Sequence, residues 1–326
     1  MRVWRVLTSF LVGTVVLGLG LTLISLADSG QSPELQRWSR PEVVVTSSSF
    51  YISADGDWLN IVGEVENRGE VPAGWVRVRV SYRDATGRVI GTDMGYPLVR
   101  PLFPGRRAPF HLLDVVPPDF VTYTLRVSAY GTRADPLPDL LIRSHSWFTT
   151  ATGIPVLVGE LENPLDVPIS RLRLPISLYD AAGQVVNVVQ AQVLRQVIPP
   201  HGRSPFVARV EDGPVGSRAW SSAAQYRLAE DSALPAGLAL GAVTPYMDAN
   251  GYLVLRGAVG NYGQERVNFV RLVGALYDDA GTILNASFSY PLTYHLDPGE
   301  VDLFEVEFRY VPETWSTYRV VVGSMP

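Results

Sequence analysis

Apolar and polar residues alternate strictly over several stretches of the chain. In residues 76–83 (VRVRVSYR), three valines and a tyrosine alternate with three arginines and a serine. A period of two turns each set of side chains to one face of a β-strand, so we expect the apolar set in a core and the polar set in water. The same columns recur over 172–178 and 270–276. No stretch beyond Leu26 carries a sustained helical pattern, which predicts an all-β fold.

A five-residue motif occurs three times along the chain. Residues 63–67 (GEVEN) recur as 159–163 (GELEN) and as 257–261 (GAVGN), at offsets of 96 and 98 residues. The same offsets relate three further sets of residues: Gly87, Gly183 and Gly281; Pro104, Pro200 and Pro298; and Phe110, Phe206 and Phe304. Four landmarks in one register indicate a triplicated unit. We name the copies repeat 1 (42–136), repeat 2 (137–234) and repeat 3 (235–326).

Turn residues separate the predicted strands within each repeat. Asp84, Asp180 and Asp278 each stand three residues before a landmark glycine. We expect the aspartate to bond the backbone two residues on, and the glycine to adopt positive φ. A proline turn then leads to the strand of the landmark phenylalanine, which we expect in the core, and a last strand closes the copy. The proline-bearing segments 135–139 and 232–237 are the expected linkers.

Short strands with turns every ~8–12 residues are typical of antiparallel sandwiches. Each copy has the length of an immunoglobulin-like domain, which is roughly 100 residues. We therefore predict an all-β protein with three tandem immunoglobulin-like antiparallel β-sandwich domains after one N-terminal transmembrane helix. The chain has no cysteine, so packing alone must hold the sheets of each sandwich together.

The repeat resembles the FxLYD domain family. Gly-Glu-Val-x-Asn is followed by a strand that ends near Leu-Tyr-Asp, then by a Pro-Gly turn and a phenylalanine. Repeat 2 reads ISLYD over 176–180 and repeat 3 reads GALYD over 274–278, whereas repeat 1 departs most, with VSYRD over 80–84. The phenylalanine of the family name is replaced by Ile, Gly and Val. The resemblance covers about residues 42–326 and implies an immunoglobulin-like envelope module of prokaryotes, with no common activity or catalytic residue.

Residues 6–26 form a run of 21 residues without a charge. As a helix this run would be roughly 31 Å long, enough to span the hydrocarbon core of a bilayer. Arg2 and Arg5 precede it, so we expect a cytoplasmic N-terminus and extracytoplasmic C-terminal domains. We favour an uncleaved signal anchor over residues 1–27. The alternative is a signal peptide cleaved after Ala27, which would give a secreted protein. Residues 28–41 are polar and broken by prolines, as expected of a juxtamembrane linker.

Composition and charge restrict the remaining classes of function. The 326-residue chain is 47% hydrophobic and lacks cysteine, which excludes a disordered chain, a disulfide scaffold and cysteine chemistry. All 27 basic residues are arginines, yet the net charge is −5 and the sequence shows no basic stripe, so we predict no nucleic-acid partner. The histidines have no second ligand at metal spacing, so we predict no metal and no cofactor; they are His111, His145, His201 and His295.

Repeated polar residues and unpaired aromatics are the remaining candidates for a site. We interpret Asn67, Asn163 and Asn261 as turn residues, and Arg77, Arg173 and Arg271 as outward, solubilising residues of strands. Three aromatics of repeat 3 lie outside the alternating core columns and are candidate binding residues, because such side chains favour interfaces and sugar faces. These residues are Tyr290, Tyr294 and Trp315.

These features favour a non-enzymatic, membrane-anchored extracytoplasmic protein that acts as an interaction or spacer module. The expected partner is a protein or another component of the cell envelope, and we expect membrane contact through residues 6–26. The sequence does not indicate an oligomeric state. A cell-surface adhesion or carbohydrate-binding protein is the alternative. A hydrolase with an unrecognised site stands behind both, because no catalytic motif occurs in the chain.

Overall fold

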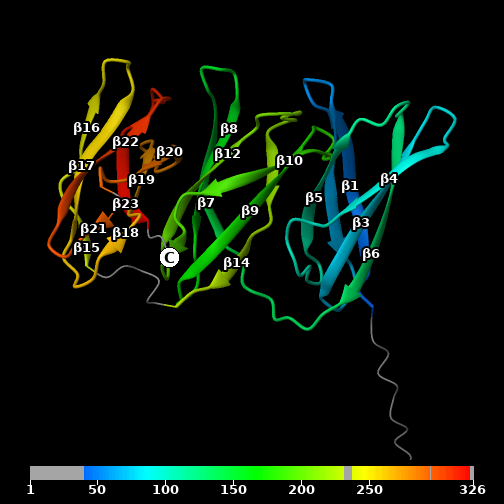
Figure 1. Ribbon diagram of the computed structural model, residues 1–326, viewed down its shortest axis with the longest axis horizontal. Helices are drawn as coiled ribbons and strands as arrows, with labels where there is room; N and C mark the ends of the chain where they lie inside the picture. The colour runs from blue at the N-terminus through cyan, green and yellow to red at the C-terminus, as the bar shows by residue number, and fades with distance from the viewer. Residues whose placement is uncertain (1–39, 231–236, 294, 324–326) are drawn as a thin grey trace, which may run out of the picture. The chain divides into compact units, whose positions relative to one another are not determined.

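The structure is a computed structural model that describes residues 40–230, 237–293 and 295–323. Ser39–Pro326 forms one compact unit. Every regular element in the described ranges is a β-strand and the sheets are antiparallel (Figure 1), which confirms the predicted all-β class. The predicted membrane segment, residues 6–26, lies outside the described residues. Within the described ranges, no helix is long and apolar enough to cross a membrane.

Repeat 1 forms two three-stranded sheets over one core. The sheet orders are β1-β2-β5 and β4-β3-β6. Apolar residues from both sheets form one buried cluster that contains Phe110 and the three alternating valines of residues 76–80, so the predicted core face is confirmed. The strands are β1 (Val43–Ile52), β2 (Trp58–Asn67), β3 (Ala73–Arg83), β4 (Val89–Gly95), β5 (Arg107–Val115) and β6 (Thr122–Gly131).

Repeat 2 repeats this arrangement, with its strands joined into one hydrogen-bonded set of order β11-β9-β10-β12-β8-β7. Strands β13 and β14 pair with β9. The core cluster contains Phe206 and the apolar column of β9. The strands are β7 (Leu141–Thr149), β8 (Pro155–Glu162), β9 (Ile169–Tyr179), β10 (Val185–Val193), β11 (Val197–Ile198), β12 (Arg203–Arg209), β13 (Ala219–Ser222) and β14 (Gln225–Leu228).

Repeat 3 has the same central strands in separate sheets. In one sheet β17 pairs with β15, β16 and β22, and the others have the orders β20-β19-β23 and β18-β21. Phe304 lies in the third core cluster. The strands are β15 (Leu238–Leu240), β16 (Thr244–Met247), β17 (Leu253–Asn261), β18 (Val267–Asn268), β19 (Arg271–Tyr277), β20 (Ile283–Ser289), β21 (His295–Leu296), β22 (Val301–Phe308) and β23 (Thr317–Gly323).

The landmark phenylalanine of each repeat packs on the first glycine of the motif. All three rings are buried, as predicted. A Cβ atom added to Gly63 would lie 2.6 Å from Cζ of Phe110, and one added to Gly257 would lie 2.6 Å from Cζ of Phe304. No other residue fits at so close an approach of ring and backbone, which explains why the motif begins with glycine.

The predicted aspartate turns are present in all three repeats. Oδ1 of Asp84 accepts the backbone N–H of Thr86 at 2.9 Å, and Gly87 has a φ of 81°. Asp180 and Asp278 make the same bond to the residue two positions on, at 2.9 and 3.0 Å. The turn chemistry expected from the sequence is therefore confirmed.

The motif asparagine does more than end a strand. Asn67 is fully buried, and its Nδ2 donates to the carbonyl oxygens of Val71 at 2.8 Å and Leu102 at 2.9 Å. Its Oδ1 accepts the backbone N–H of Gly69, which is the turn role that the sequence predicts. Asn163 and Asn261 are buried and bonded in the same way. The asparagine thus ties two loops of its repeat together.

Candidate functional site

The outward face of the alternating strand is open along most of its length only in repeat 1. The polar side chains of β3 are exposed or half-buried, whereas residues 174–178 of β9 and 272–277 of β19 are buried on both faces. The expectation of a water-facing side therefore holds at Arg173, which is exposed, and is wrong for residues 174–178 and 272–277. The physical reason is that the preceding repeat covers that face, and we describe these two inter-repeat contacts as the candidate functional site.

A pair of serines on the first strand of one repeat binds the backbone of the next. The N–H of Val185 donates to Oγ of Ser47 at 2.8 Å, and Oγ of Ser49 donates to the carbonyl of Val185 at 2.7 Å. The serines therefore imitate the edge of a strand and fix the register of one repeat on the next. The same two bonds recur in the second contact at 3.1 and 2.7 Å, between Ile283 and the serines Ser144 and Ser146.

A motif glutamate of one repeat is buried against a tyrosine of the next. Oε1 of Glu64 accepts a hydrogen bond from Oγ of Ser177 at 2.7 Å and another from the hydroxyl of Tyr179 at 2.9 Å. In the second contact, Oε1 of Glu160 accepts the hydroxyl of Tyr277 at 2.6 Å. Glu64 is 2% exposed and Glu160 is 3% exposed, so these bonds replace the water that each carboxylate has lost. The second residue of the motif and the tyrosine of Leu-Tyr-Asp are two halves of one repeated contact.

Each contact has an apolar part beside the carboxylate. Val62 of β2 forms a buried cluster with Val185 and Val188 of β10 in the first contact. Val158, at the same position of β8, belongs to a buried cluster with residues of β19 and β20 in the second. Burial of these side chains supplies the non-directional attraction that the polar bonds orient.

An aromatic ring at the end of the first strand extends each contact. The hydroxyl of Tyr51 donates to Oδ1 of Asn187 at 3.2 Å, and at the same position of β7 the ring of Phe148 stacks on Tyr310 with centroids 4.5 Å apart. Burial and the nearby carboxylate of Asp212 raise the pKa of Tyr51 to about 12. The Tyr51 hydroxyl therefore stays protonated and able to donate at neutral pH.

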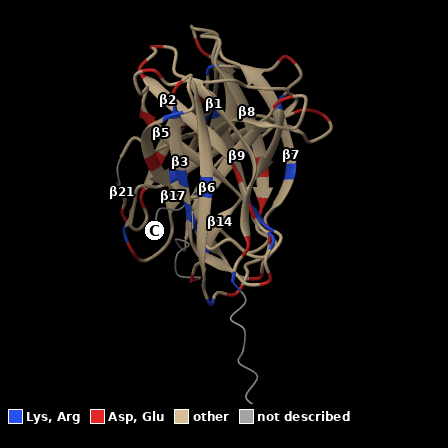
Figure 2. Cartoon of the chain, turned by 90° about the vertical axis from the view of Figure 1, so that its right-hand side faces the viewer, with Lys and Arg blue, Asp and Glu red and all other residues tan. Residues whose placement is uncertain are grey.

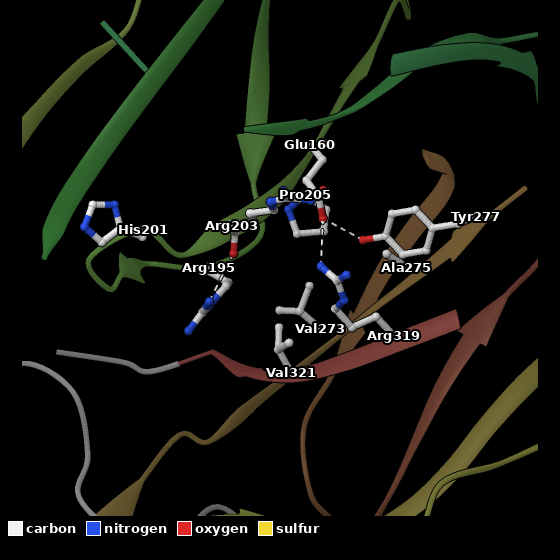
Figure 3. Close-up of a pocket in the computed structure, with 10 residues that line it drawn as sticks. All are labelled: Glu160, Arg195, His201, Arg203, Pro205, Val273, Ala275, Tyr277, Arg319 and Val321. Atoms are coloured by element: carbon white, nitrogen blue, oxygen red, sulfur yellow. Dashed lines mark hydrogen bonds and ion pairs between the residues drawn. The ribbon is translucent and has the colours of Figure 1, made fainter. Parts of the chain in front are cut away.

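The second contact also encloses a crevice of about 360 Å³ lined with arginines (Figure 3). Nη1 of Arg203 lies 3.2 Å from Oε2 of Glu160, and Nη1 of Arg319 lies 3.5 Å from Oε1 of the same carboxylate. Arg195 completes the lining; burial lowers its pKa, and its Nε is buried with no hydrogen-bond partner. Three guanidinium groups and one carboxylate make the crevice a favourable environment for an anionic group.

A second carboxylate orients Arg203 from outside the crevice. Nε of Arg143 and Nε of Arg203 donate to Oε2 of Glu162 at 2.8 and 2.9 Å. The guanidinium of Arg143, and then that of Arg203, lower the pKa of Glu162 to about 2. Burial and the bond to Glu160 raise the pKa of Tyr277, so its phenol remains a donor. The arrangement is built to hold charges in fixed positions.

The predicted binding aromatics of repeat 3 have separate surroundings. Tyr290 accepts a hydrogen bond from Nη2 of Arg271 at 2.9 Å, and its ring lies edge-on to Phe288. Trp315 packs against the core cluster of repeat 3. Tyr294 lies outside the described residues. Arg271 was expected to point into water. It instead donates hydrogen bonds to Tyr290 and, at 3.2 Å, to the carbonyl of Leu194 in repeat 2.

Three of the histidines, His111, His145 and His201, each lie next to a polar or aromatic side chain. Nε2 of His111 lies 2.8 Å from Oδ1 of Asn60, and burial lowers the pKa of His111. His201 pairs with Asp166 at 2.9 Å. Among the described residues, no group of three or more His, Asp or Glu side chains converges as a metal site.

Sequence reasoning missed the two buried glutamates, although a signal was present. The motif carries Glu64 in repeat 1 and Glu160 in repeat 2, but Ala258 in repeat 3. A charged residue between buried apolar positions of a central strand needs a partner. The glutamate is present in the two copies whose partner tyrosine lies in the next repeat, Tyr179 for Glu64 and Tyr277 for Glu160.

No protein-family model matches the chain, and no curated protein matches it significantly. The resemblance to the FxLYD family therefore rests on the residues quoted above.

Proposed function

We propose that the chain is a non-enzymatic, membrane-anchored extracytoplasmic spacer. In this proposal, three immunoglobulin-like β-sandwiches of the FxLYD type follow a signal anchor at residues 6–26. Each sandwich docks on the one before it, so that the array holds a fixed separation between the membrane and whatever binds its far end. Docking, and not catalysis, is the activity that these residues support.

One observation carries the proposal: the same set of contacts occurs twice, at equivalent positions. A serine pair, a buried glutamate–tyrosine bond and a valine cluster join repeat 1 to repeat 2, and again repeat 2 to repeat 3. Repeats joined by flexible linkers need no such specific contact. Duplication of the contact along with the fold supports selection for a fixed orientation between neighbours.

The two ends of the array differ from its interior. In repeat 3, Arg256 takes the position of the interface valines, where it bonds to Glu305 at 2.6 Å and lies over the ring of Tyr246. Ala258 replaces the interface glutamate. In repeat 1, Arg83 takes the position of the interface tyrosine. Repeat proteins need such polar terminal faces, because an uncapped interface would bind further copies.

Distance measurements between the first and third repeats test the proposal. The chain lacks cysteine, so spin labels can be placed at Ala85→Cys and Ala280→Cys, two exposed turn positions. We expect one narrow distance distribution for the full chain in a bilayer, because both contacts are formed. Addition of Val62→Arg or Val158→Arg should broaden it. A broad distribution in the unsubstituted double-cysteine protein would contradict a fixed spacer.

The same cysteine tests the proposed location. In intact cells, a membrane-impermeant maleimide should label Ala280→Cys, since the proposal places repeat 3 outside the membrane. Labelling that requires cell lysis would overturn the extracytoplasmic assignment. Carbohydrate binding through repeat 3 is not the function we propose, because Tyr290 is engaged by Arg271 and Trp315 packs against a core.

A further inference from the structure

The terminal face of repeat 1 carries an unusual concentration of arginines. We define the arginine face as the outward residues Trp75, Arg77, Arg79, Arg126 and Tyr130 of β3 and β6, which are exposed. Figure 2 looks toward this side of the unit, and shows basic segments on both strands. No basic stripe is visible in the sequence because Arg126 lies 47 residues beyond Arg79, and the two strands meet only in the sheet.

The charges on the arginine face are not balanced by the protein. Arg79 and Arg126 are directly opposite each other in the β3–β6 register, a like-charge arrangement that destabilises a sheet. Strands β3 and β6 contain no acidic residue, and Asp93 of β4 pairs opposite the buried Val80. The ion pairs formed among the described residues do not include Arg77, Arg79 or Arg126. An anionic partner would remove this repulsion.

Two aromatic side chains lie at one end of the face. Trp75 and Tyr130 are cross-strand partners and are 65% and 70% exposed. Met94 of β4, opposite Arg79, is 47% exposed. Tryptophan and tyrosine beside arginines are typical of surfaces that lie in the headgroup region of a membrane, where rings enter the interface and guanidinium groups bind phosphates.

Repeat 3 has no arginines at the positions of Arg79 and Arg126. The position of Arg79 is Val273 in repeat 3, and that of Arg126 is Val321, and both valines face repeat 2 across the crevice. A second copy of the chain is a poor occupant of the arginine face, since the free end of repeat 3 presents Arg256 and no motif glutamate. The face is thus adapted to something other than a repeat.

We propose that the arginine face binds the anionic lipid headgroups of the bilayer that carries the anchor. This inference rests on the proposed function, because it places repeat 1 flat on the membrane and directs repeats 2 and 3 away from it. The face lies on the sheet opposite the one that contacts repeat 2. The chain between Leu26 and Val43 can extend about 55 Å, which is enough for the face to reach the bilayer surface.

Vesicle sedimentation tests the proposal without the anchor. Residues 40–326 contain all the described cores within one compact unit, and circular dichroism would first establish that this fragment is folded and β-rich. We expect the fragment to sediment with phosphatidylcholine vesicles containing about 30% phosphatidylglycerol and not with phosphatidylcholine alone, and expect high salt to release it. Equal sedimentation with both vesicles, or with neither, would overturn the proposal.

Paired substitutions assign the binding to the face. Replacement of Arg79 and Arg126 by Gln should weaken partitioning about 25-fold, since each arginine near an anionic surface contributes about a factor of five. Removal of two like charges that oppose each other should leave the melting temperature unchanged or raised. The control is Arg256→Gln with Arg309→Gln, which removes the same charge from repeat 3 and should leave partitioning unchanged.

The same fragment distinguishes an anionic polymer from anionic lipid as the ligand of the arginine face. If dextran sulfate binds the fragment through Arg79 and Arg126 while anionic vesicles do not, the occupant is a polymer and the lipid proposal is wrong. Partitioning that the Arg79→Gln, Arg126→Gln variant retains would also overturn it. The vesicle result is independent of the spin-label result, so failure of lipid binding leaves the test of the spacer intact.

Discussion

The two inter-repeat contacts bury a glutamate at the same position but surround it differently. Glu64 accepts hydrogen bonds from hydroxyl groups only, those of Ser177, Tyr179 and, at 3.4 Å, Ser221. Glu160 accepts hydrogen bonds from Tyr277 and Arg203 and lies beside Arg319 in an open crevice. The serine pair and the glutamate–tyrosine bond are common to both contacts. The geometry of docking is thus constant, whereas the compensation of the buried charge varies.

The two contacts should therefore differ in how strongly they respond to salt. Neutral hydroxyl donors depend on distance and direction, and salt screens them little. Guanidinium groups that are half-exposed, as Arg203 and Arg319 are, remain accessible to counterions and to other anions. The first contact should therefore respond to changes of shape, and the second also to changes of charge.

The largest effect is expected from an arginine in the valine cluster. Val158→Arg places a cation in an apolar cluster next to a crevice that already holds three arginines, and should cost about 3 kcal/mol or more. Urea unfolding followed by tryptophan fluorescence, with limited proteolysis between repeats 2 and 3, would measure it. Repeat 3 should undock before it unfolds.

Val62→Arg is the matched variant for the first contact. Its new guanidinium would lie two residues from Glu64, which has only hydroxyl partners, whereas Glu160, at the same distance from Val158, already lies beside Arg203 and Arg319. We expect a smaller loss of stability than for Val158→Arg. Equal losses would show that burial alone, and not the charge of the surroundings, controls docking.

Neutralising the glutamates is the next test. Glu160→Gln leaves Arg319 without its carboxylate partner and weakens the charge-assisted bond of Tyr277, and should cost about 1–3 kcal/mol. Glu64→Gln keeps an amide oxygen for the three hydroxyl donors, and should cost under about 1 kcal/mol. Unfolding free energies from urea titrations decide between the two. A larger loss for Glu64→Gln would reverse our assignment of the charge-sensitive contact.

Acid should weaken repeat 2 through Glu162. The pKa of this carboxyl is lowered from its ordinary value of 4.5 to about 2 by Arg143 and Arg203. The stability that it contributes is present above pH 4.5 and is lost as the pH falls through about 2. Glu162→Gln should flatten the acid limb of a stability–pH curve in this window. Glu66→Gln is the control, because the ion pairs of Glu66 are longer, at 3.6 Å; an equal flattening would contradict the assignment.

Much of the fold was accessible from the sequence because it repeats. Three copies in one register predicted that the landmark phenylalanines lie in the core and that the landmark aspartates form turns, and both predictions are confirmed. A two-residue period assigns one face of a strand to a core, but cannot say whether water or another repeat covers the second face. That is why the buried second faces of β9 and β19 were not predicted.

The site was harder to predict because its halves come from different copies. Glu64 and Tyr179 are 115 residues apart in the sequence, and each is explicable within its own repeat. Arg79 and Arg126 likewise become neighbours only through the pairing of β3 with β6. Copy-specific departures from the repeat, such as Ala258 and Arg83, were the usable signal, since they replace the glutamate and the tyrosine of the inter-repeat contacts.

The smallest expected effect is that of salt on the unsubstituted protein. Raising the ionic strength from about 0.05 to 0.5 M shortens the Debye length from ~14 Å to ~4 Å. It should weaken the Arg203 and Arg319 pairs with Glu160, but half-exposed pairs contribute only about 0–1 kcal/mol. The loss should therefore not exceed about 1 kcal/mol. The response should be smaller in Glu160→Gln than in Glu64→Gln, as measured by urea unfolding at both salt concentrations, because other half-exposed pairs such as Arg256–Glu305 remain in both variants. An equal salt response in the two variants would place the charge-sensitive contact elsewhere in the unit.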